Sequence, residues 1–107
     1  MEAKGNVFLG NGRFELRQIT LPPLEERDVL IRNRVCGICG TDVHIYHGEK
    51  GTSDTNPPVV LGHEYSGDIV QVGNAVKTLR PGDKVTVDPN IYCGECRYCR
   101  SGEKQMC

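Results

Sequence analysis

Apolar and polar residues alternate along several short stretches of the chain, which is the pattern of half-buried β-strands. The clearest stretch is Phe14–Ile19, and the two prolines at 22–23 would prevent that strand from continuing. A turn is predicted at Pro81-Gly82-Asp83, directly before the last alternating stretch. The pattern predicts four strands, over residues 14–19, 28–35, 64–72 and 84–87.

A single short helix is predicted after Gly40, with Thr41 or Asp42 as its N-cap. Elsewhere the 13 glycines and 6 prolines favour turns over long helices. The polar segment 48–58 ends in prolines and is predicted to be an exposed loop. The expected fold is therefore mainly β, a partly open barrel with one short helix and a cysteine lobe at its end.

Length and charge favour one small domain with a small-molecule role. The chain has 107 residues, and its 13 basic and 14 acidic side chains are interspersed and give a formal net charge of −1. This balance indicates neither a nucleic-acid nor an anionic-membrane partner. No apolar signal segment follows Met1, and no stretch reaches the roughly 18 apolar residues of a membrane span. A cytoplasmic, reducing location is expected.

Four cysteines near the C-terminal end carry the strongest chemical signal, with the spacing C-x2-C-x2-C-x7-C. Four thiolates can form the closed tetrahedral set that a structural zinc ion requires. Glycines at 94 and 102 permit tight turns, and basic residues at 97, 100 and 104 offset the negative charge of a zinc–thiolate centre. Two disulfides or a four-cysteine iron site are the alternatives. The predicted zinc ligands are Cys93, Cys96, Cys99 and Cys107.

A second group of potential ligands is spread over two segments, Cys39 in one and His63 in the other. They are 24 residues apart, so they can meet only if separate elements bring them together, as in a catalytic zinc site with an open position. Asp42 and Glu64 are candidates for orienting His63 or supporting the metal.

Thr41 and His44 follow Cys39 closely and could pass a proton between the site and solvent. Each of these residues also has a simpler interpretation. Thr41 could be only a helix cap, and Glu64 only a surface charge. The triplet at 62–64 is not the H-E-x-x-H zinc motif, because Gly67 occupies the position of the second histidine.

Two neighbouring residues are expected to have no chemical role. Cys36 directly follows the second predicted strand, where Val29, Ile31 and Val35 would share one face, and it is predicted to be a small core residue. His47 is predicted to lie on the surface.

Four segments of the chain, taken together and in their order along the sequence, resemble the zinc-containing medium-chain alcohol and polyol dehydrogenases. They are the runs 35–44 and 58–67, the turn and strand at 76–85, and the four-cysteine cluster. The resemblance extends from about Glu15 to Cys107. It implies a GroES-like β-barrel in which residues 1–107 form the N-terminal part of the catalytic domain. A Rossmann domain for NAD(P) would follow, and the complete enzyme would be a homo-oligomer that oxidises an alcohol or polyol.

The resemblance also implies a role for individual residues. Cys39 and His63 match ligands of the catalytic zinc, and Glu64 matches an acidic residue beside it. Asp42 matches the residue that supports the ligand histidine, while Thr41 and His44 match a proton relay. The four clustered cysteines match the structural zinc set. In the implied mechanism zinc lowers the pKa of the substrate hydroxyl, and hydride passes to a nicotinamide.

Two features depart from the family pattern. A third protein ligand for the catalytic zinc is not among these residues, and Gly10-Asn11-Gly12 does not continue into a dinucleotide-binding G-x-G-x-x-G motif. The chain is therefore expected to be part of a longer enzyme and to be inactive by itself. A lean towards sorbitol-like polyol dehydrogenases rests on Gly40 and the run 88–91. The alternatives are a non-enzymatic zinc-binding interaction module and a rubredoxin-like electron carrier.

Overall fold

A computed structural model describes residues 1–48 and 55–107 of the chain. Most of the loop predicted at 48–58 lies outside these residues. The elements are β1 (Glu2–Gly10), β2 (Arg13–Thr20), β3 (Val29–Gly37), α1 (Gly40–Tyr46), β4 (Val59–Val60), β5 (Glu64–Val72), β6 (Lys84–Thr86), α2 (Arg97–Arg100) and the short 3₁₀ helix η1 (Lys104–Met106).

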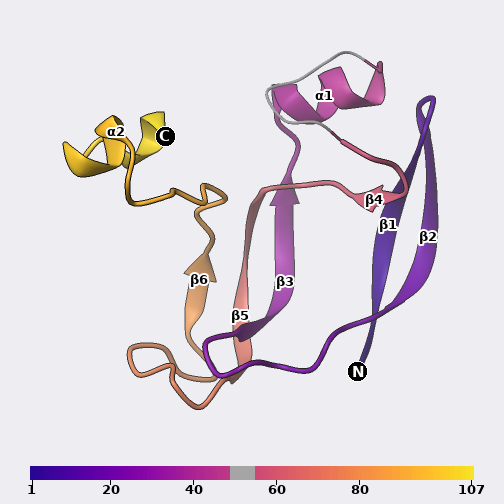
Figure 1. The fold of residues 1–107 in the computed structure, drawn as a ribbon. Helices are drawn as coiled ribbons and strands as arrows, with labels where there is room; N and C mark the ends of the chain where they lie inside the picture. The colour runs from indigo at the N-terminus through magenta and orange to yellow at the C-terminus, as the bar shows by residue number, and fades with distance from the viewer. Residues whose placement is uncertain (49–54) are drawn as a thin grey trace.

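The strands form two antiparallel sheets of three strands each, with the orders β2-β1-β4 and β3-β5-β6. Helix α1 follows β3 at one end of the sheets, and α2 and η1 form a separate lobe beyond β6 (Figure 1). The fold is mainly β with a short helix after Gly40 and a cysteine lobe, as predicted from the sequence, whereas α2 and η1 within the lobe were not predicted.

The four predicted strands are present, although their ends differ by up to two residues. Two strands were not predicted. In β1 the adjacent residues Val7 and Phe8 are both buried, so the strand does not show the alternation used for the prediction. β4 contains two residues and is too short to produce a pattern.

The predicted N-cap of α1 is wrong by two or three residues. The cap is Cys39, with φ −105° and ψ 171°, whereas Thr41 and Asp42 lie inside the helix. The Asp42 side chain accepts a hydrogen bond from the Cys39 backbone N–H at 3.1 Å, and the Cys39 side chain faces the backbone of Asp42, which completes a capping box. Asp42 therefore fixes the start of the helix from its third position.

The predicted burial of Cys36 is also wrong, because its side chain is exposed. The pairing of β3 with β5 shifts between Asn33 and Val35, so Arg34 is an extra residue on β3. Such a bulge interrupts the strict alternation of faces along a strand. Residues 32–37 of β3 are all exposed, with Val35 at 65%, so the core that was predicted around Cys36 does not form there.

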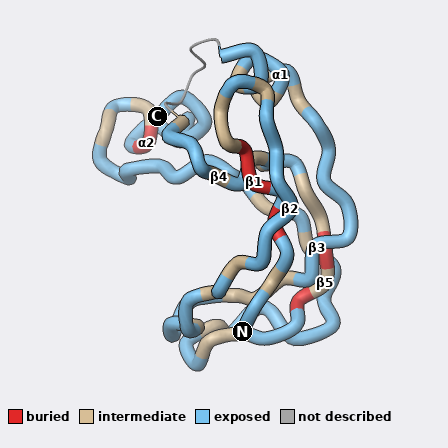
Figure 2. Tube along the Cα trace, turned by 90° about the vertical axis from the view of Figure 1, so that its right-hand side faces the viewer, coloured by how far each residue is buried: buried red, intermediate tan, exposed pale blue. Residues whose placement is uncertain are grey.

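The buried core is small and divided between the sheets. Val7 and Phe8 are buried in the first sheet and Ile69 in the second, while Cys99 is buried in the lobe (Figure 2). His47 is exposed, as predicted. Among the residues that the structure describes, no helix is both long and apolar enough to cross a membrane.

Candidate metal centres

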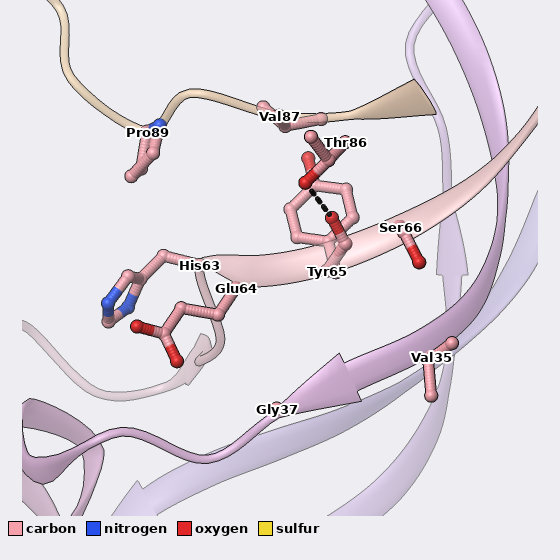
Figure 3. A pocket seen from close by; sticks show the side chains of 9 residues that line it. All are labelled: Val35, Gly37, His63, Glu64, Tyr65, Ser66, Thr86, Val87 and Pro89. Atoms are coloured by element: carbon pink, nitrogen blue, oxygen red, sulfur yellow. Dashed lines mark hydrogen bonds between the residues drawn. The ribbon is translucent and has the colours of Figure 1, made fainter. Parts of the chain in front are cut away.

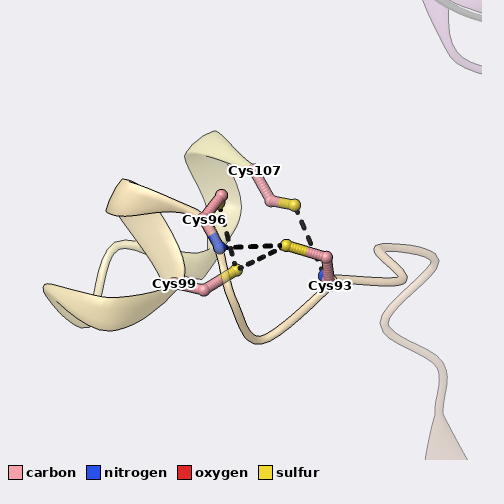
Figure 4. A group of neighbouring side chains, drawn as sticks. All are labelled: Cys93, Cys96, Cys99 and Cys107. Atoms are coloured by element: carbon pink, nitrogen blue, oxygen red, sulfur yellow. Dashed lines mark hydrogen bonds between the residues drawn. The ribbon is translucent and has the colours of Figure 1, made fainter.

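The four cysteines of the lobe converge on one point (Figure 4). Their sulfur atoms all lie within 4.8 Å of one another. The Sγ atom of Cys99 is 3.5 Å from that of Cys96 and 3.9 Å from that of Cys93. These separations exceed the roughly 2.05 Å of a disulfide bond, and the cysteines are free. Sulfurs held at about 2.3 Å from a tetrahedral ion would be about 3.8 Å apart, so the set fits a zinc ion.

Local backbone geometry in the lobe prepares the sulfurs for a metal. The chain turns tightly at Gly94, with φ +79°, and the backbone N–H groups of Glu95 and Cys96 point at the Cys93 sulfur, at 3.4 and 3.2 Å. These hydrogen bonds lower the pKa of Cys93 to about 6. Because a metal ligand must be a thiolate, this turn favours the form that binds.

The other sulfurs differ in their surroundings. Hydrogen bonds from Cys99 lower the pKa of Cys96, whereas burial raises the pKa of Cys99 to about 11. Cys107 accepts a hydrogen bond from the Cys93 backbone N–H at 3.4 Å, which joins the last residue of the lobe to the first of the four potential ligands. A cation would offset the cost of ionising four neighbouring thiols, and this favours metal binding at the cluster.

The second group forms where the start of α1 meets the start of β5. Cys39 caps α1, and His63 directly precedes β5, whose first residue Glu64 pairs with Gly37 at the end of β3. This register brings the Cys39 Sγ atom to 3.2 Å from His63 Nε2. The structure thus brings together two residues that are 24 positions apart.

Glu64 completes a set of three potential ligands. One carboxylate oxygen of Glu64 lies within 4.8 Å of both the Cys39 sulfur and a ring nitrogen of His63. The side chains of His63 and Glu64 project in the same direction at the end of β5 (Figure 3). They line an open pocket of about 440 Å³, whose other walls include Thr86, Val87 and Pro89. The trio of Cys39, His63 and Glu64 is named below the open site.

Asp42 connects the helix cap to the open site. One carboxylate oxygen accepts the Cys39 backbone N–H, and the other lies 4.0 Å from His63 Nδ1. Nε2, the other ring nitrogen, faces the Cys39 sulfur. Nδ1 therefore faces the carboxylate, which is the usual arrangement behind a metal-bound histidine.

The two remaining predicted residues lie on α1. Thr41 is half-buried and His44 is exposed, and a separation of three residues places them on the same side of the helix. Thr41 is therefore the member of the pair nearer to Cys39 in the helix, and His44 is the member more exposed to solvent. Their proposed relay role stays a prediction.

The donor atoms of both groups fit zinc. One group offers four sulfurs, and the other offers sulfur, nitrogen and oxygen in an open arrangement. Closed sulfur sets are typical of structural zinc, and mixed sets with an open position are typical of catalytic zinc.

Comparisons with known proteins agree with this architecture. The family model described as the alcohol dehydrogenase GroES-like domain matches residues 25–107. An L-threonine 3-dehydrogenase from Edwardsiella ictaluri is 44% identical over 93 residues, which cover 86% of this chain and 27% of the relative. The chain therefore spans about a quarter of the length of the curated relatives that it matches.

Solved structures of dehydrogenases are also similar to this chain. A zinc-binding dehydrogenase from Sinorhizobium meliloti, bound to NADP, is 39% identical with a TM-score of 0.83, over 97% of this chain and 30% of that one. An alcohol dehydrogenase from Thermus sp. ATN1 is 37% identical with a TM-score of 0.80, over 98% of this chain and 30% of that one.

Proposed function

This chain belongs to the alcohol dehydrogenase GroES-like domain family, and on that premise we propose that it is the metal-holding N-terminal part of a zinc-dependent dehydrogenase. The complete enzyme would oxidise an alcohol and reduce NAD or NADP. The observation that carries the proposal is the 3.2 Å approach of Cys39 Sγ to His63 Nε2, with the Glu64 carboxylate beside them.

In this proposal, the open site and the cysteine lobe have different tasks. Cys39 and His63 would hold a zinc ion that acts as a Lewis acid on the substrate oxygen when bound. The Glu64 carboxylate lies beside them and would add a negative charge next to the ion. The lobe would hold a second zinc ion with a structural role, since its four sulfurs leave no position for a substrate.

The residues of α1 would handle the substrate proton. Thr41, which is half-buried, would accept the hydroxyl proton, and the exposed His44 would return it to solvent. Asp42 would hold the tautomer of His63 that presents Nε2 to the metal, because its carboxylate faces Nδ1. Hydride would leave for a nicotinamide held by another part of the complete protein, and the relative bound to NADP supports that expectation.

Two substrate classes are proposed for the first tests. The relatives at 42–44% identity are L-threonine 3-dehydrogenases, and threonine carries a secondary alcohol beside an amino group. Polyols, predicted from the sequence, carry a secondary alcohol beside a hydroxyl. In both classes a second polar group adjoins the alcohol that is oxidised, so a small polar secondary alcohol is the common substrate class.

The test is a nucleotide-reduction assay on the full encoded protein loaded with zinc. L-Threonine and a series of polyols are each offered with NAD⁺ and with NADP⁺. The proposal predicts reduction with at least one pair, and loss of that reduction in Cys39→Ser. Absence of reduction by the metal-loaded protein with every alcohol would contradict it.

Cys36→Ser is the matched control, since Cys36 lies three residues before Cys39 and outside both groups of potential ligands. Its rate is expected to stay within about 2-fold of the wild type, because serine is close to cysteine in size and the side chain is exposed. An equal loss in both variants would show that a thiol in this segment, rather than the Cys39 ligand, is needed.

A further inference from the structure

Helix α1 carries the groups proposed to act at the open site, yet it is weakly held. It is seven residues long, and none of them is buried. A helix this short has little stability of its own and takes its position from tertiary contacts. What fixes α1 therefore bears directly on the geometry of the open site.

A series of aromatic rings connects the last residue of α1 to the core of the first sheet. Phe8, which is 3% exposed, lies 5.1 Å from Phe14 between ring centroids. Phe14 in turn stacks on Tyr46 at 6.1 Å, with only 12° between the ring planes. The connection runs from a buried strand residue, across the β1–β2 hairpin, to the helix.

The hairpin is shaped to receive the tyrosine. Gly12, in the turn between β1 and β2, has φ +67°, and a Cβ atom there would lie 3.1 Å from Tyr46 Cζ and 3.3 Å from its Oη. Any side chain at position 12 would therefore press on the ring. The turn lies beside the C-terminal end of α1 (Figure 1), so the ring is held by Gly12 and by Phe14.

Tyr46 and Asp42 are four residues apart, so they lie on the same face of α1. Both line one cavity of about 580 Å³ between the first sheet, β3 and the helix. A helix is stiff over one turn, so a shift of the Tyr46 end moves Asp42 with it. Asp42 is the residue whose carboxylate contacts the Cys39 backbone and faces His63.

We infer that Tyr46 is a positioning residue for the open site: its ring, stacked on Phe14 and seated over Gly12, fixes α1 so that Asp42 stays against Cys39 and His63. This inference rests on the proposed metal role of Cys39 and His63. The aromatic ring carries the effect, because the recorded contacts are ring stacking and close packing.

The test measures Co²⁺ binding to the full encoded protein, using the absorption of the cobalt–thiolate bond. The part of the signal that Cys39→Ser removes reports the open site alone, and the rest reports the lobe. Tyr46→Ala is expected to weaken the Cys39-dependent affinity about 10-fold, the lower range for residues that support metal ligands. Tyr46→Phe keeps the ring and is expected to bind as the wild type does.

Asp42→Asn shows whether Tyr46 acts through Asp42. In that background Tyr46→Ala is expected to weaken the open site much less than 10-fold, because the carboxylate charge that Tyr46 would hold against His63 is already absent. If the affinity losses of Tyr46→Ala and Asp42→Asn simply add in the double variant, Tyr46 does not act through Asp42. The lobe signal is expected to stay unchanged in every variant, since within the described residues the ring contacts of Phe14 and Tyr46 involve no residue of α2 or η1.

Each remaining outcome decides the matter. Unchanged affinity in Tyr46→Ala, or an equal loss in Tyr46→Phe, would overturn the inference. If Tyr46→Ala also loses the lobe signal, Tyr46→Leu, which keeps most of the volume without an aromatic ring, replaces it and must show the Cys39-dependent loss. A wild-type protein without any Cys39-dependent signal would refute the proposed function itself, whatever Tyr46 does.

Discussion

The cysteine lobe and the open site assemble their potential ligands in opposite ways. All four sulfurs of the lobe lie within residues 93–107, and a turn at Gly94 and two short helices bring them together. The open site joins Cys39, at the start of α1, to His63, at the start of β5. Its geometry depends on the pairing of β3 with β5.

This difference implies that the two regions are stabilised differently. The only buried hydrophobic residue that the lobe contributes within the described chain is Cys99, itself a potential ligand. Without a metal the lobe has little to hold it, whereas the strands beside the open site have backbone ladders. We expect the lobe to be ordered by its metal and the open site to be ordered before its metal binds.

The largest expected effect is the loss of the lobe on removal of its metal. Chelation or Cys96→Ser is expected to disorder residues 91–107, because structural zinc supplies roughly 10 kcal/mol or more in small lobes. The strands before Asp88 should remain folded. Amide hydrogen exchange, with and without chelator, measures both regions in one experiment.

Cys36→Ser is the control for that experiment, since it removes a thiol outside the lobe and should leave the exchange pattern unchanged. If the lobe stays protected after verified metal removal, packing rather than metal orders it, and the contrast between the two regions disappears.

An intermediate effect is expected at the open site from the loss of one charge. Asp42→Asn keeps an oxygen that can accept the Cys39 backbone N–H but removes the negative charge 4.0 Å from His63 Nδ1. Metal affinity at the open site should fall about 10- to 100-fold, with the lobe metal unchanged. Titration with Co²⁺ in the wild type and the variant measures this.

Asp42→Ala separates the two roles of the carboxylate. It also removes the capping contact, so an additional loss of about 1 kcal/mol in helix stability is expected. Equal affinity in Asp42→Asn and the wild type would mean that the charge facing His63 has no influence on the metal.

The smallest expected effect concerns side-chain packing within the lobe. Lys104 Nζ lies 4.4 Å from the centre of the Tyr92 ring and connects η1 to the segment before Cys93. An exposed contact of this type contributes about 0.5–1 kcal/mol, so Lys104→Ala should weaken zinc binding by about 2- to 5-fold. Competition with a chromophoric chelator resolves a change of this size.

Lys77→Ala removes the same charge outside the lobe, where Lys77 reaches only the backbone oxygen of Asn74 among its recorded contacts. It should leave lobe affinity unchanged. A loss for Lys104→Ala as large as that for a ligand substitution would show that packing, and not the metal, orders the lobe.

Prediction of the fold from sequence succeeded where apolar and polar residues alternate and failed where they do not. β2 alternates and was found, whereas β1 has a run of apolar residues, of which the adjacent Val7 and Phe8 are both buried. The bulge at Arg34 left no sequence signal. A bulge depends on the pairing of two strands, which neither strand encodes alone.

Helix α1 was likewise predicted only in part. The sequence indicated a helix after Gly40, but it did not show that Cys39 would be the cap and Asp42 its partner. Thr, Asp and Cys follow one another closely there, and the choice of cap depends on where the chain leaves β3. The contribution of Tyr46 was also not visible from sequence, because Phe14 and Gly12 lie more than 30 positions away.

The sequence by itself determined the four-sulfur lobe, since its potential ligands are separated by two or seven residues and a short turning chain has few ways to place them. It also indicated, through resemblance, which residues form the open site. Only the tertiary structure decided that Cys39 and His63 meet at 3.2 Å, with Asp42 behind and Glu64 beside them. That meeting depends on the register of two strands and on the placement of α1, which are properties of the packed chain rather than of any one segment.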